Sequence, residues 1–397
     1  MRLLMGVISC LIFLLLTTLT QGADSKWEQL NSQVIKLYSE GKYIEAIKIA
    51  REALETAEND YGREHSNVAK SLNNLGLLYK KQGKYKDAEI LYTRALEIRE
   101  KEDGVNDPAT ITSVNNLAEL FKSQARYMES ESFYKRALET REKHLGPEHP
   151  KVGISLNNLA GLYTLQGKYN KAIELYKRAL TIFKNTFGSN HLRVAQTLNN
   201  MAALYESKGN LETAESIYKL SLERYENSVG IEHPESAALL NNLSSLYKAM
   251  GNFGKAQMYC EKALAIREKV FGKVHPEVGQ SVNNLGAIYQ FQNKLAASEA
   301  HYMRAYRIWE KTLGSEHPQT ATALSNLGGL YYIQDKYNKA IEAFEQALKI
   351  REKKLESSGQ EILILLENLV LCYKKNGNSE QAEKLQKRIN QIKTSYL

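Results

Sequence analysis

The sequence predicts an all-α protein, an α-solenoid in which antiparallel helix pairs stack into one right-handed superhelix. Three observations support this fold class. The doublet Asn157-Asn158 recurs, with changes at its first position, every 42 residues along a chain of 397 residues. Each copy holds two stretches of helical periodicity separated by a short break. No linker or low-complexity tract interrupts the series, so each copy is expected to stack directly on its neighbours.

The first helix of a repeat, called helix A here, is clearest in the copy that begins at Lys70. Between Leu72 and Gln82 apolar residues recur at helical spacing. Within this helix Gly76 is small, and we expect another backbone to approach it closely. Helix A is therefore expected to bury one flank against its repeat partner.

The second helix, helix B, follows after a break at Gly83, with apolar residues at helical spacing from Ala88 to Ile98. Neither helix can bury its apolar stripe alone. The pair is therefore expected to close as a hairpin that the next pair covers.

The breaks between helices are as regular as the helices. The turn inside each pair has a residue that accepts a left-handed helix end, mostly glycine: Gly83, Gly167, Gly209, Gly251 and Gly377, with Ala125, Asn293 and Asp335 in other copies. The turn between pairs carries a His-Pro step at His149-Pro150, His233-Pro234, His275-Pro276 and His317-Pro318. Proline suits the first turn of a helix, so helix A is expected to restart near each of these prolines.

The first 22 residues differ from the rest of the chain. Arg2 precedes an unbroken apolar run from Leu3 to Leu16, and a small, polar stretch follows up to Gly22. This pattern predicts a signal peptide over residues 1–22, a mature chain that begins at Ala23, and export to the periplasm or the medium. The alternative is an uncleaved segment that anchors the protein in the membrane, although the run is short for a spanning helix.

Residues 23–397 are predicted to form a single solenoid of about nine helix pairs. The first pair (residues 24–65) and the last pair (residues 360–397) depart most from the repeat pattern and are expected to act as caps, with Trp27 as an extra apolar anchor. Cys260 and Cys372 occupy apolar columns more than two repeats apart, so both are expected to be free, buried thiols.

The sequence contains no catalytic constellation, and we predict no enzyme activity, no cofactor and no metal site. The recurrent histidines each fall in the same turn of a different repeat, too far apart to share an ion, and are expected to order the turn before helix A. The net charge of +8 is modest for this length, and basic residues alternate with glutamates along helix B. That alternation is typical of a solvated surface and argues against nucleic-acid binding.

The repeat itself resembles a known family. Small residues at Gly76 or Ala160, with Ala88, Tyr92 and Ala95 in helix B, resemble the tetratricopeptide consensus. The 42-residue period is similar to the repeats of kinesin light chains and their bacterial relatives, and the chain resembles an exported bacterial member. The likeness covers about residues 25 to 395. Two features differ from kinesin light chains: an export-like segment stands where their coiled coil lies, and the first copy is irregular.

The asparagines are the main candidates for a binding site. On a helical wheel Lys70, Asn74, Leu77 and Lys81 form a stripe opposite the side that packs within the repeat. In similar tetratricopeptide arrays the helix A faces line a concave groove, where an asparagine at this place bonds the backbone of an extended peptide. The corresponding series is Asn74, Asn116, Asn158, Asn200, Asn242, Asn284, Asn326 and Asn368. An amide can both donate to and accept from a peptide unit. The alternative is that these amides bond the neighbouring helix and only hold the repeat spacing.

The residues around this series change along the chain. A column of small residues leaves room for a ligand: Gly161, Ala203, Ser245, Ala287 and Gly329. Phe291 and Ile333, with Tyr332 beside them, predict an apolar pocket at one end, whereas Lys81 and Lys122 make the other end basic. We therefore predict a non-catalytic scaffold that binds an extended peptide or a segment of a protein partner in this groove. The alternative is an architectural part of a cell-envelope or secretion assembly that uses its convex surface and ends.

Overall fold

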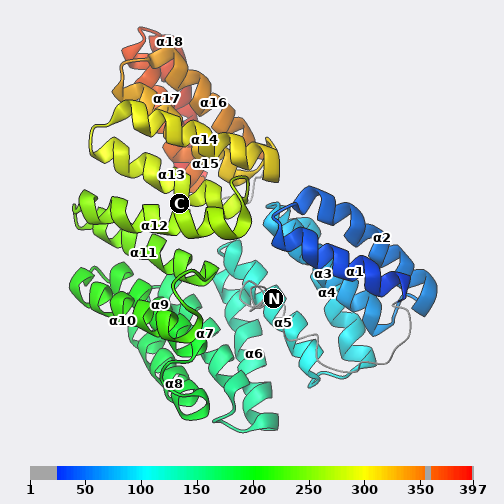
Figure 1. The fold of residues 1–397 in the computed structure, drawn as a ribbon. Coiled ribbons are helices and arrows are strands. Elements are labelled where there is room, and N and C mark those ends of the chain that lie inside the picture. The colour runs from blue at the N-terminus through cyan, green and yellow to red at the C-terminus, as the bar shows by residue number, and fades with distance from the viewer. Residues whose placement is uncertain (1–24, 354–358, 396–397) are drawn as a thin grey trace. The chain divides into compact units, whose positions relative to one another are not determined.

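The computed structural model describes residues 25–353 and 359–395, so the predicted signal peptide at residues 1–22 lies outside the described residues. The described residues form eighteen α-helices and no strand, as the sequence predicts (Figure 1). The helices A are α1 (Lys26–Ser39), α3 (Ser66–Lys81), α5 (Pro108–Ser123), α7 (Pro150–Leu165), α9 (Leu192–Ser207), α11 (Pro234–Ala249), α13 (Pro276–Phe291), α15 (Pro318–Ile333) and α17 (Gly359–Lys375). The helices B are α2 (Tyr43–Tyr61), α4 (Tyr85–Glu102), α6 (Tyr127–Leu145), α8 (Tyr169–Phe187), α10 (Leu211–Val229), α12 (Phe253–Phe271), α14 (Leu295–Leu313), α16 (Tyr337–Lys353) and α18 (Ser379–Ser395).

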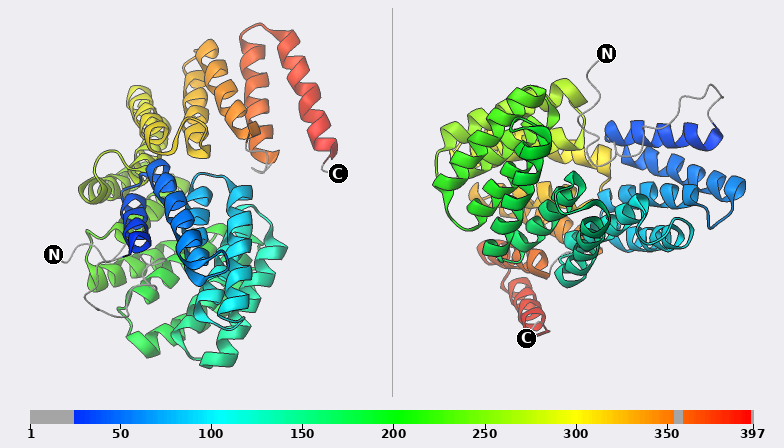
Figure 2. Two further views of the ribbon diagram at one scale, coloured as in Figure 1. Left: turned by 90° about the vertical axis from the view of Figure 1, so that its right-hand side faces the viewer. Right: turned by 90° about the horizontal axis from the view of Figure 1, so that it is seen from below.

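Within α1 to α11 and within α13 to α18, consecutive helices pack on one another as the helix pairs of an α-solenoid, which confirms the predicted fold class. The chain divides into two compact units, Met1–Ile266 and Arg267–Leu397, and the division falls within α12. In the second unit, α13 to α18 follow one another as a row of helices, yellow to red in Figure 2, each packed on the next. Each unit is described by itself below.

The turns have the backbone conformation that their residues predict. The turn inside each pair has a positive φ at the predicted residue, including 66° at Gly83 and 58° at each of Ala125, Asn293 and Asp335. Prolines occupy the first residue of five helices A: α5, α7, α11, α13 and α15. The residue with positive φ ends helix A, and the proline begins helix A of the following repeat. The residues of the two turns therefore fix where each helix pair begins and where its first helix ends.

Glycines at one repeating position of helix A, Gly76, Gly286 and Gly328, make room for an aromatic ring of helix B. A Cβ on Gly76 would lie 2.7 Å from Cε1 of Tyr92, and Gly328 meets the ring of Phe344 in the same way. This corrects the expectation of a backbone approach, because a side chain fills the space at Gly76. Tyr92 and Phe344 are almost fully buried. Burying such a side chain stabilises the fold by about 1.5–3 kcal/mol.

Arginines at the end of helix B fix the next repeat. Arg141 Nη1 donates to the carbonyl of Lys151 at 3.2 Å and to Ser155 Oγ at 2.8 Å. Burial lowers the pKa of Arg141 to about 10. Arg267 makes the same two kinds of bond to Glu277 and Ser281. Because charge-assisted hydrogen bonds are stronger than neutral ones, these arginines help to set the register between successive pairs.

Trp27 and the two cysteines are buried, as the sequence predicts. Trp27 is buried and its Nε1 donates to Ser71 Oγ at 2.8 Å, which ties α1 to α3. Cys260 and Cys372 are free and buried, and burial raises the pKa of Cys372 to about 11. Of the helices in the described ranges, none combines the length and the apolar character that crossing a membrane requires.

Candidate functional site

The asparagine series lies half-buried along the helices A and forms a ladder between repeats. In five copies the amide Nδ2 donates to the Oδ1 of an asparagine 43 residues earlier, in the preceding helix A, at 2.8 to 3.3 Å: Asn74 to Asn31, Asn116 to Asn73, Asn200 to Asn157, Asn242 to Asn199 and Asn326 to Asn283. One N–H of each amide thus holds the spacing between repeats, which is the architectural use considered above.

The other members of the series differ. Asn284 accepts a bond at Oδ1 from Gln280 Nε2 at 3.0 Å. Asn158 and Asn368 lie half-buried at the same helical position. Asn115, the residue that would accept from Asn158, instead donates to the carbonyl of Ile111 at 2.7 Å. The ladder is therefore interrupted at this repeat.

The amides keep bonding capacity after the ladder forms. Among the described residues, the Oδ1 atoms of Asn74, Asn116 and Asn326 accept no hydrogen bond, and each Nδ2 has a second N–H. A half-buried acceptor and donor on successive helices A are what an extended peptide backbone requires. The geometry is compatible with both uses of these asparagines.

The apolar end of the predicted groove belongs to the second unit. Phe291 ends α13 and is 62% exposed, and Ile333 ends α15 and is 51% exposed. Tyr332 is half-buried, with its ring centroid 5.7 Å from that of Tyr337. Next to the ladder, a Cβ on Gly329 would meet no atom within 4 Å. These residues leave an open, partly apolar surface beside Asn326.

The basic end belongs to the first unit, and its lysines have partners. Lys81 Nζ lies 5.9 Å from the centroid of the Tyr38 ring. Lys122 Nζ lies 2.6 Å from Glu119 Oε2. Burial alone would raise the pKa of Glu119, but Lys122, Lys80 and the hydroxyl of Tyr134 together lower it. The charge of Lys122 is therefore largely compensated.

A carboxylate network around Glu131 joins two successive repeats of the first unit. Glu131 accepts bonds from Tyr163, Gln166 and Lys168 of the next repeat, and Lys135 lies 2.8 Å away. Burial would raise the pKa of Glu131, but the donated hydrogen bonds outweigh it and lower the pKa to about 2. This group is a structural anion rather than a proton donor near neutral pH.

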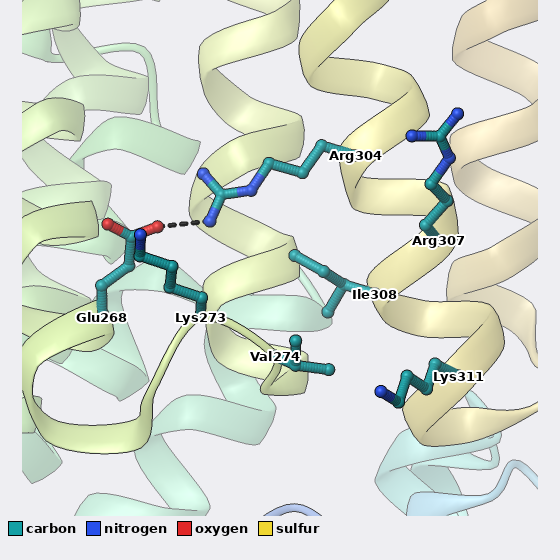
Figure 3. Close-up of a pocket in the computed structure, with 7 residues that line it drawn as sticks. All are labelled: Glu268, Lys273, Val274, Arg304, Arg307, Ile308 and Lys311. Carbon is teal, nitrogen blue, oxygen red and sulfur yellow. Dashed lines mark hydrogen bonds and ion pairs between the residues drawn. The ribbon is translucent and has the colours of Figure 1, made fainter.

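A pocket that the sequence did not predict lies in the second unit, on α12, α14 and the turn that follows α12 (Figure 3). It has a volume of about 540 Å³ and is lined by Glu268, Lys273, Val274, Arg304, Arg307, Ile308 and Lys311. The sequence does indicate this pocket in the turn before α13, where Lys273-Val274 occupies the positions of Pro147-Glu148. Reading each turn as a variant of one motif hides such a difference in charge.

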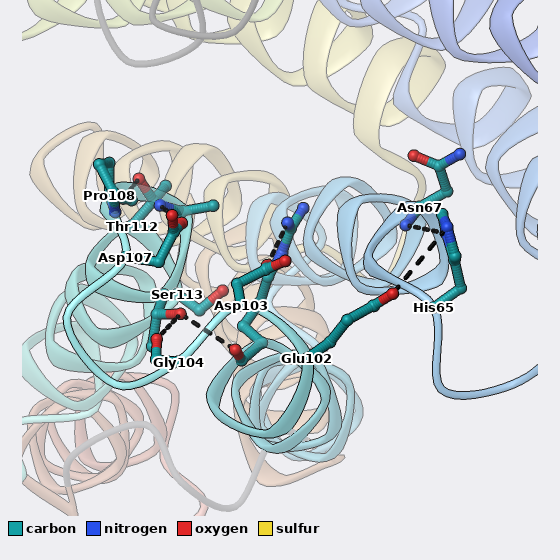
Figure 4. Close-up of polar contacts among 12 residues, drawn as sticks. His65, Asn67, Glu102, Asp103, Gly104, Asp107, Pro108, Thr112 and Ser113 are labelled. Atoms are coloured by element: carbon teal, nitrogen blue, oxygen red, sulfur yellow. Dashed lines mark hydrogen bonds and ion pairs between the residues drawn. The ribbon is translucent and has the colours of Figure 1, made fainter.

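The recurrent histidines are helix caps. Nδ1 of His65 accepts from the backbone N–H of Asn67 at 3.0 Å, and Nε2 of His65 lies 3.9 Å from Glu102 Oε1 (Figure 4). Histidines in five other turns cap helix A in the same way, and Asp107 does so for α5. The turn before helix A is thus ordered by the side chain of its last residue, which directly precedes the helix and caps it.

A family model described as tetratricopeptide repeat matches residues 36–101, 109–185, 154–227, 193–269, 235–305 and 277–353, more than half of the chain. The chain belongs to the tetratricopeptide repeat family. Tetratricopeptide repeats build interaction scaffolds, and the helix pairs, capped turns and small residues described above are those of such a scaffold. The repeat pattern quoted in the sequence analysis is therefore a true family signature.

The chain is also similar to several solved structures. BtubC (BKLC) from P. vanneervenii is 25% identical, with a TM-score of 0.44, over 63% of this chain and 94% of that chain. A putative kinesin light chain from Podosopora anserina is 26% identical, with a TM-score of 0.44, over 52% and 97%. A Rap protein complexed with Competence and Sporulation Factor is 16% identical, with a TM-score of 0.56, over 94% and 99%, and shares the fold. Comparison with curated proteins gives no significant match.

Proposed function

We propose that this tetratricopeptide protein is a non-catalytic scaffold that binds an extended segment of a protein partner along its helices A. The observation that carries the proposal is the ladder of half-buried amides at a constant 42-residue spacing. At Asn74, Asn116 and Asn326 the remaining acceptor and donor of the amide bond no other residue within the described ranges. In an extended peptide every backbone unit offers a donor and an acceptor, so a regular series of amides can bind it with little dependence on its sequence.

Selectivity would come from the side chains beside the ladder. In the second unit, Phe291 and Ile333 present apolar surface, and the open space at Gly329 admits a ligand close to Asn326. An apolar side chain of the partner would be desolvated there, whereas its backbone would bond the amides of Asn284 and Asn326.

The decisive experiment compares the loss of Asn326 and Asn284, the amides proposed to bind the peptide, with the loss of Asn283, which bonds Asn326 within the ladder. Partners are first identified by crosslinking in the native host, and a peptide from the crosslinked segment is then used for measurements of affinity. Asn326→Ala with Asn284→Ala should weaken binding by roughly 5- to 150-fold, because each lost bond costs about 0.5–1.5 kcal/mol. Phe291→Asp should weaken binding further, because the partner's apolar group would face a charge.

Asn283→Ala is the matched control. It removes the same bond between repeats at 2.8 Å but leaves the amide of Asn326 in place. We expect Asn283→Ala to lower stability as much as Asn326→Ala does, yet to retain binding. Equal loss of stability with unchanged binding in all these variants would show that the ladder only sets the repeat spacing. An architectural role in an envelope or secretion assembly would then replace the groove.

We also propose that the protein is exported, because residues 1–22 have the composition of a signal peptide. N-terminal sequencing of the native protein tests this. A chain that starts at or near Ala23 supports export and cleavage. Recovery of Met1 in a membrane fraction would support the uncleaved anchor, and recovery of Met1 in the cytosol would contradict export.

A further inference from the structure

Two kinds of ion pair recur along the helices B. One kind joins a helix B to the preceding helix B, and the other joins a helix B to the turn that precedes helix A of the same repeat. In the first, an arginine of helix B pairs with a glutamate 36 residues earlier: Arg94 with Glu58, Arg136 with Glu100, Arg178 with Glu142, Arg304 with Glu268 and Arg388 with Glu352. In the second, a lysine near the end of helix B pairs with a glutamate 37 residues earlier, in the turn before helix A: Lys101 with Glu64 and Lys353 with Glu316. In each of these pairs a cation of helix B lies next to a glutamate.

The repeat that contains α14 departs from the second pattern, as does the repeat that contains α6, where Lys143 has Asn106 at the place of the glutamate. Lys311 occupies the column of Lys101 and Lys353, but the residue 37 positions earlier is Val274 instead of a glutamate. In the described part of the chain, Lys311 has no ion pair. The turn also carries Lys273, at a position that is serine or proline in the turns at Ser315 and Pro147.

A second substitution adds charge to the same place. Arg307 is exposed on α14, one turn before Lys311, at a position that is glutamate in other repeats: Glu97, Glu139 and Glu223. Among the described residues Arg307 has no ion pair either. Compared with the aligned positions of the repeats named above, this repeat has a valine in place of an acid at Val274 and additional cations at Arg307 and Lys273.

These residues line the 540 Å³ pocket together (Figure 3). Its lining holds four cations and one carboxylate, and that carboxylate, Glu268, is already paired with Arg304. Ile308 and Val274 lie between the charged groups and give the pocket an apolar floor. A site of this kind matches a ligand with several negative charges next to an aliphatic group.

We propose that this pocket binds an acidic segment of a partner protein, in which carboxylates face Arg307, Lys311 and Lys273 and an aliphatic side chain covers Val274 and Ile308. The site lies on helix B and the turn between repeats, so it is distinct from the asparagine ladder and goes beyond the proposed groove. The open shape and the exposed cations favour a protein segment that lies across the surface. Binding should weaken with salt, because solvent-exposed charges are screened within about 10 Å at 0.1 M ionic strength.

The test uses a fluorescein-labelled peptide that alternates Glu-Glu with Leu, with a Gln-Gln-Leu peptide as the uncharged reference, and measures anisotropy on the full chain. Val274→Glu is the sharpest variant, because it restores the acid that stands in other turns, such as Glu148 and Glu316, and should leave the fold intact. We expect Val274→Glu and Arg307→Glu each to weaken binding of the acidic peptide at least 10-fold at low salt.

Lys349→Glu is the matched control, because Lys349 occupies the column of Arg307 one repeat later, where the turn retains Glu316. We expect less than a twofold change for it, and no change for Asn326→Ala on the ladder. Equal binding of the two peptides, or an equal effect of Lys349→Glu, would overturn the proposal. So would full displacement of the peptide by inorganic phosphate at matched ionic strength, which would show a site for small anions.

Discussion

The histidines of the turns show how one side chain can set where a helix begins. Six of them accept the backbone N–H two residues later through Nδ1, at 3.0 to 3.2 Å. Only an unprotonated Nδ1 can accept this bond, so the cap requires the neutral ring. In three turns the ring also stacks on an aromatic residue that precedes it: His65 on Tyr61, His191 on Phe187 and His275 on Phe271.

Stability should therefore fall as the solution is acidified through the range where histidine protonates. Burial lowers the pKa of His191, with Arg193 adding to the effect, and burial lowers the pKa of His233 against the attraction of Glu235. A histidine with a lowered pKa in the folded state stabilises the fold above its unfolded pKa of about 6.5, and this contribution is lost as pH falls below it. Urea unfolding at pH 7.5 and 6.0 should show the decrease.

His191→Asp provides the control for that prediction, because an aspartate, Asp107, caps α5 in the same way, and aspartate side chains ordinarily titrate near pH 4, well below the range of histidine. The variant should retain most of the stability at pH 7.5 and lose less between pH 7.5 and 6.0. Replacing the cap by alanine should instead cost about 0.5–2 kcal/mol at pH 7.5. An unchanged pH dependence in His191→Asp would mean that this cap does not contribute to it.

At the scale of the helix pair, a glycine of helix A and an aromatic ring of helix B close the hairpin. The same contact joins Gly286 to Tyr302 and Gly328 to Phe344. Helix propensity alone disfavours glycine inside a helix by about 1 kcal/mol relative to alanine. The packing of the ring compensates for this, because a methyl group at the same place would collide with it.

Two adjacent glycines of α15 allow the effect of side-chain packing on stability to be measured separately from the effect of helix propensity. A Cβ on Gly328 would lie 2.8 Å from the ring of Phe344, whereas one on Gly329 would meet no atom within 4 Å. Gly328→Ala should lower the free energy of unfolding by about 1–3 kcal/mol through overpacking. Gly329→Ala should raise it by about 0.5–1 kcal/mol. Chemical denaturation of both variants checks the two signs, and destabilisation of similar size in both would contradict the packing explanation.

The sequence was most informative where a local rule decides the structure. Left-handed residues such as Asn293 and first-turn prolines such as Pro276 mark helix ends within a few residues, so the pairs could be placed before the structure was known. The partner of Asn326 could not be found in this way. A helical wheel shows which side of one helix is apolar, but the bond to Asn283 depends on the register between two repeats.

At the scale of the whole chain, each pair is stabilised by the next one, so the last pair must end the apolar core. Ile341, Phe344 and Leu348 of α16 belong to one buried cluster with Leu366 and Leu369 of α17. Only Ala382 and Ile389 of α18 are fully buried in that cluster, and the remaining surface of the helix is largely polar. This asymmetry is what a terminal repeat needs, because one face meets the core and the other meets water.

Removal of residues 354–397 should therefore expose the apolar face of α16. Each large side chain that loses its cover should cost roughly 1.5–3 kcal/mol, so the truncated chain should melt at a lower temperature and bind a dye that reports exposed apolar surface. Lys384→Ser with Lys387→Ser changes only the outer face of α18 and should leave both properties unchanged. A truncated chain with the melting temperature of the full protein would contradict the capping role, because it would mean that Phe344 and its neighbours are stable without α17 and α18.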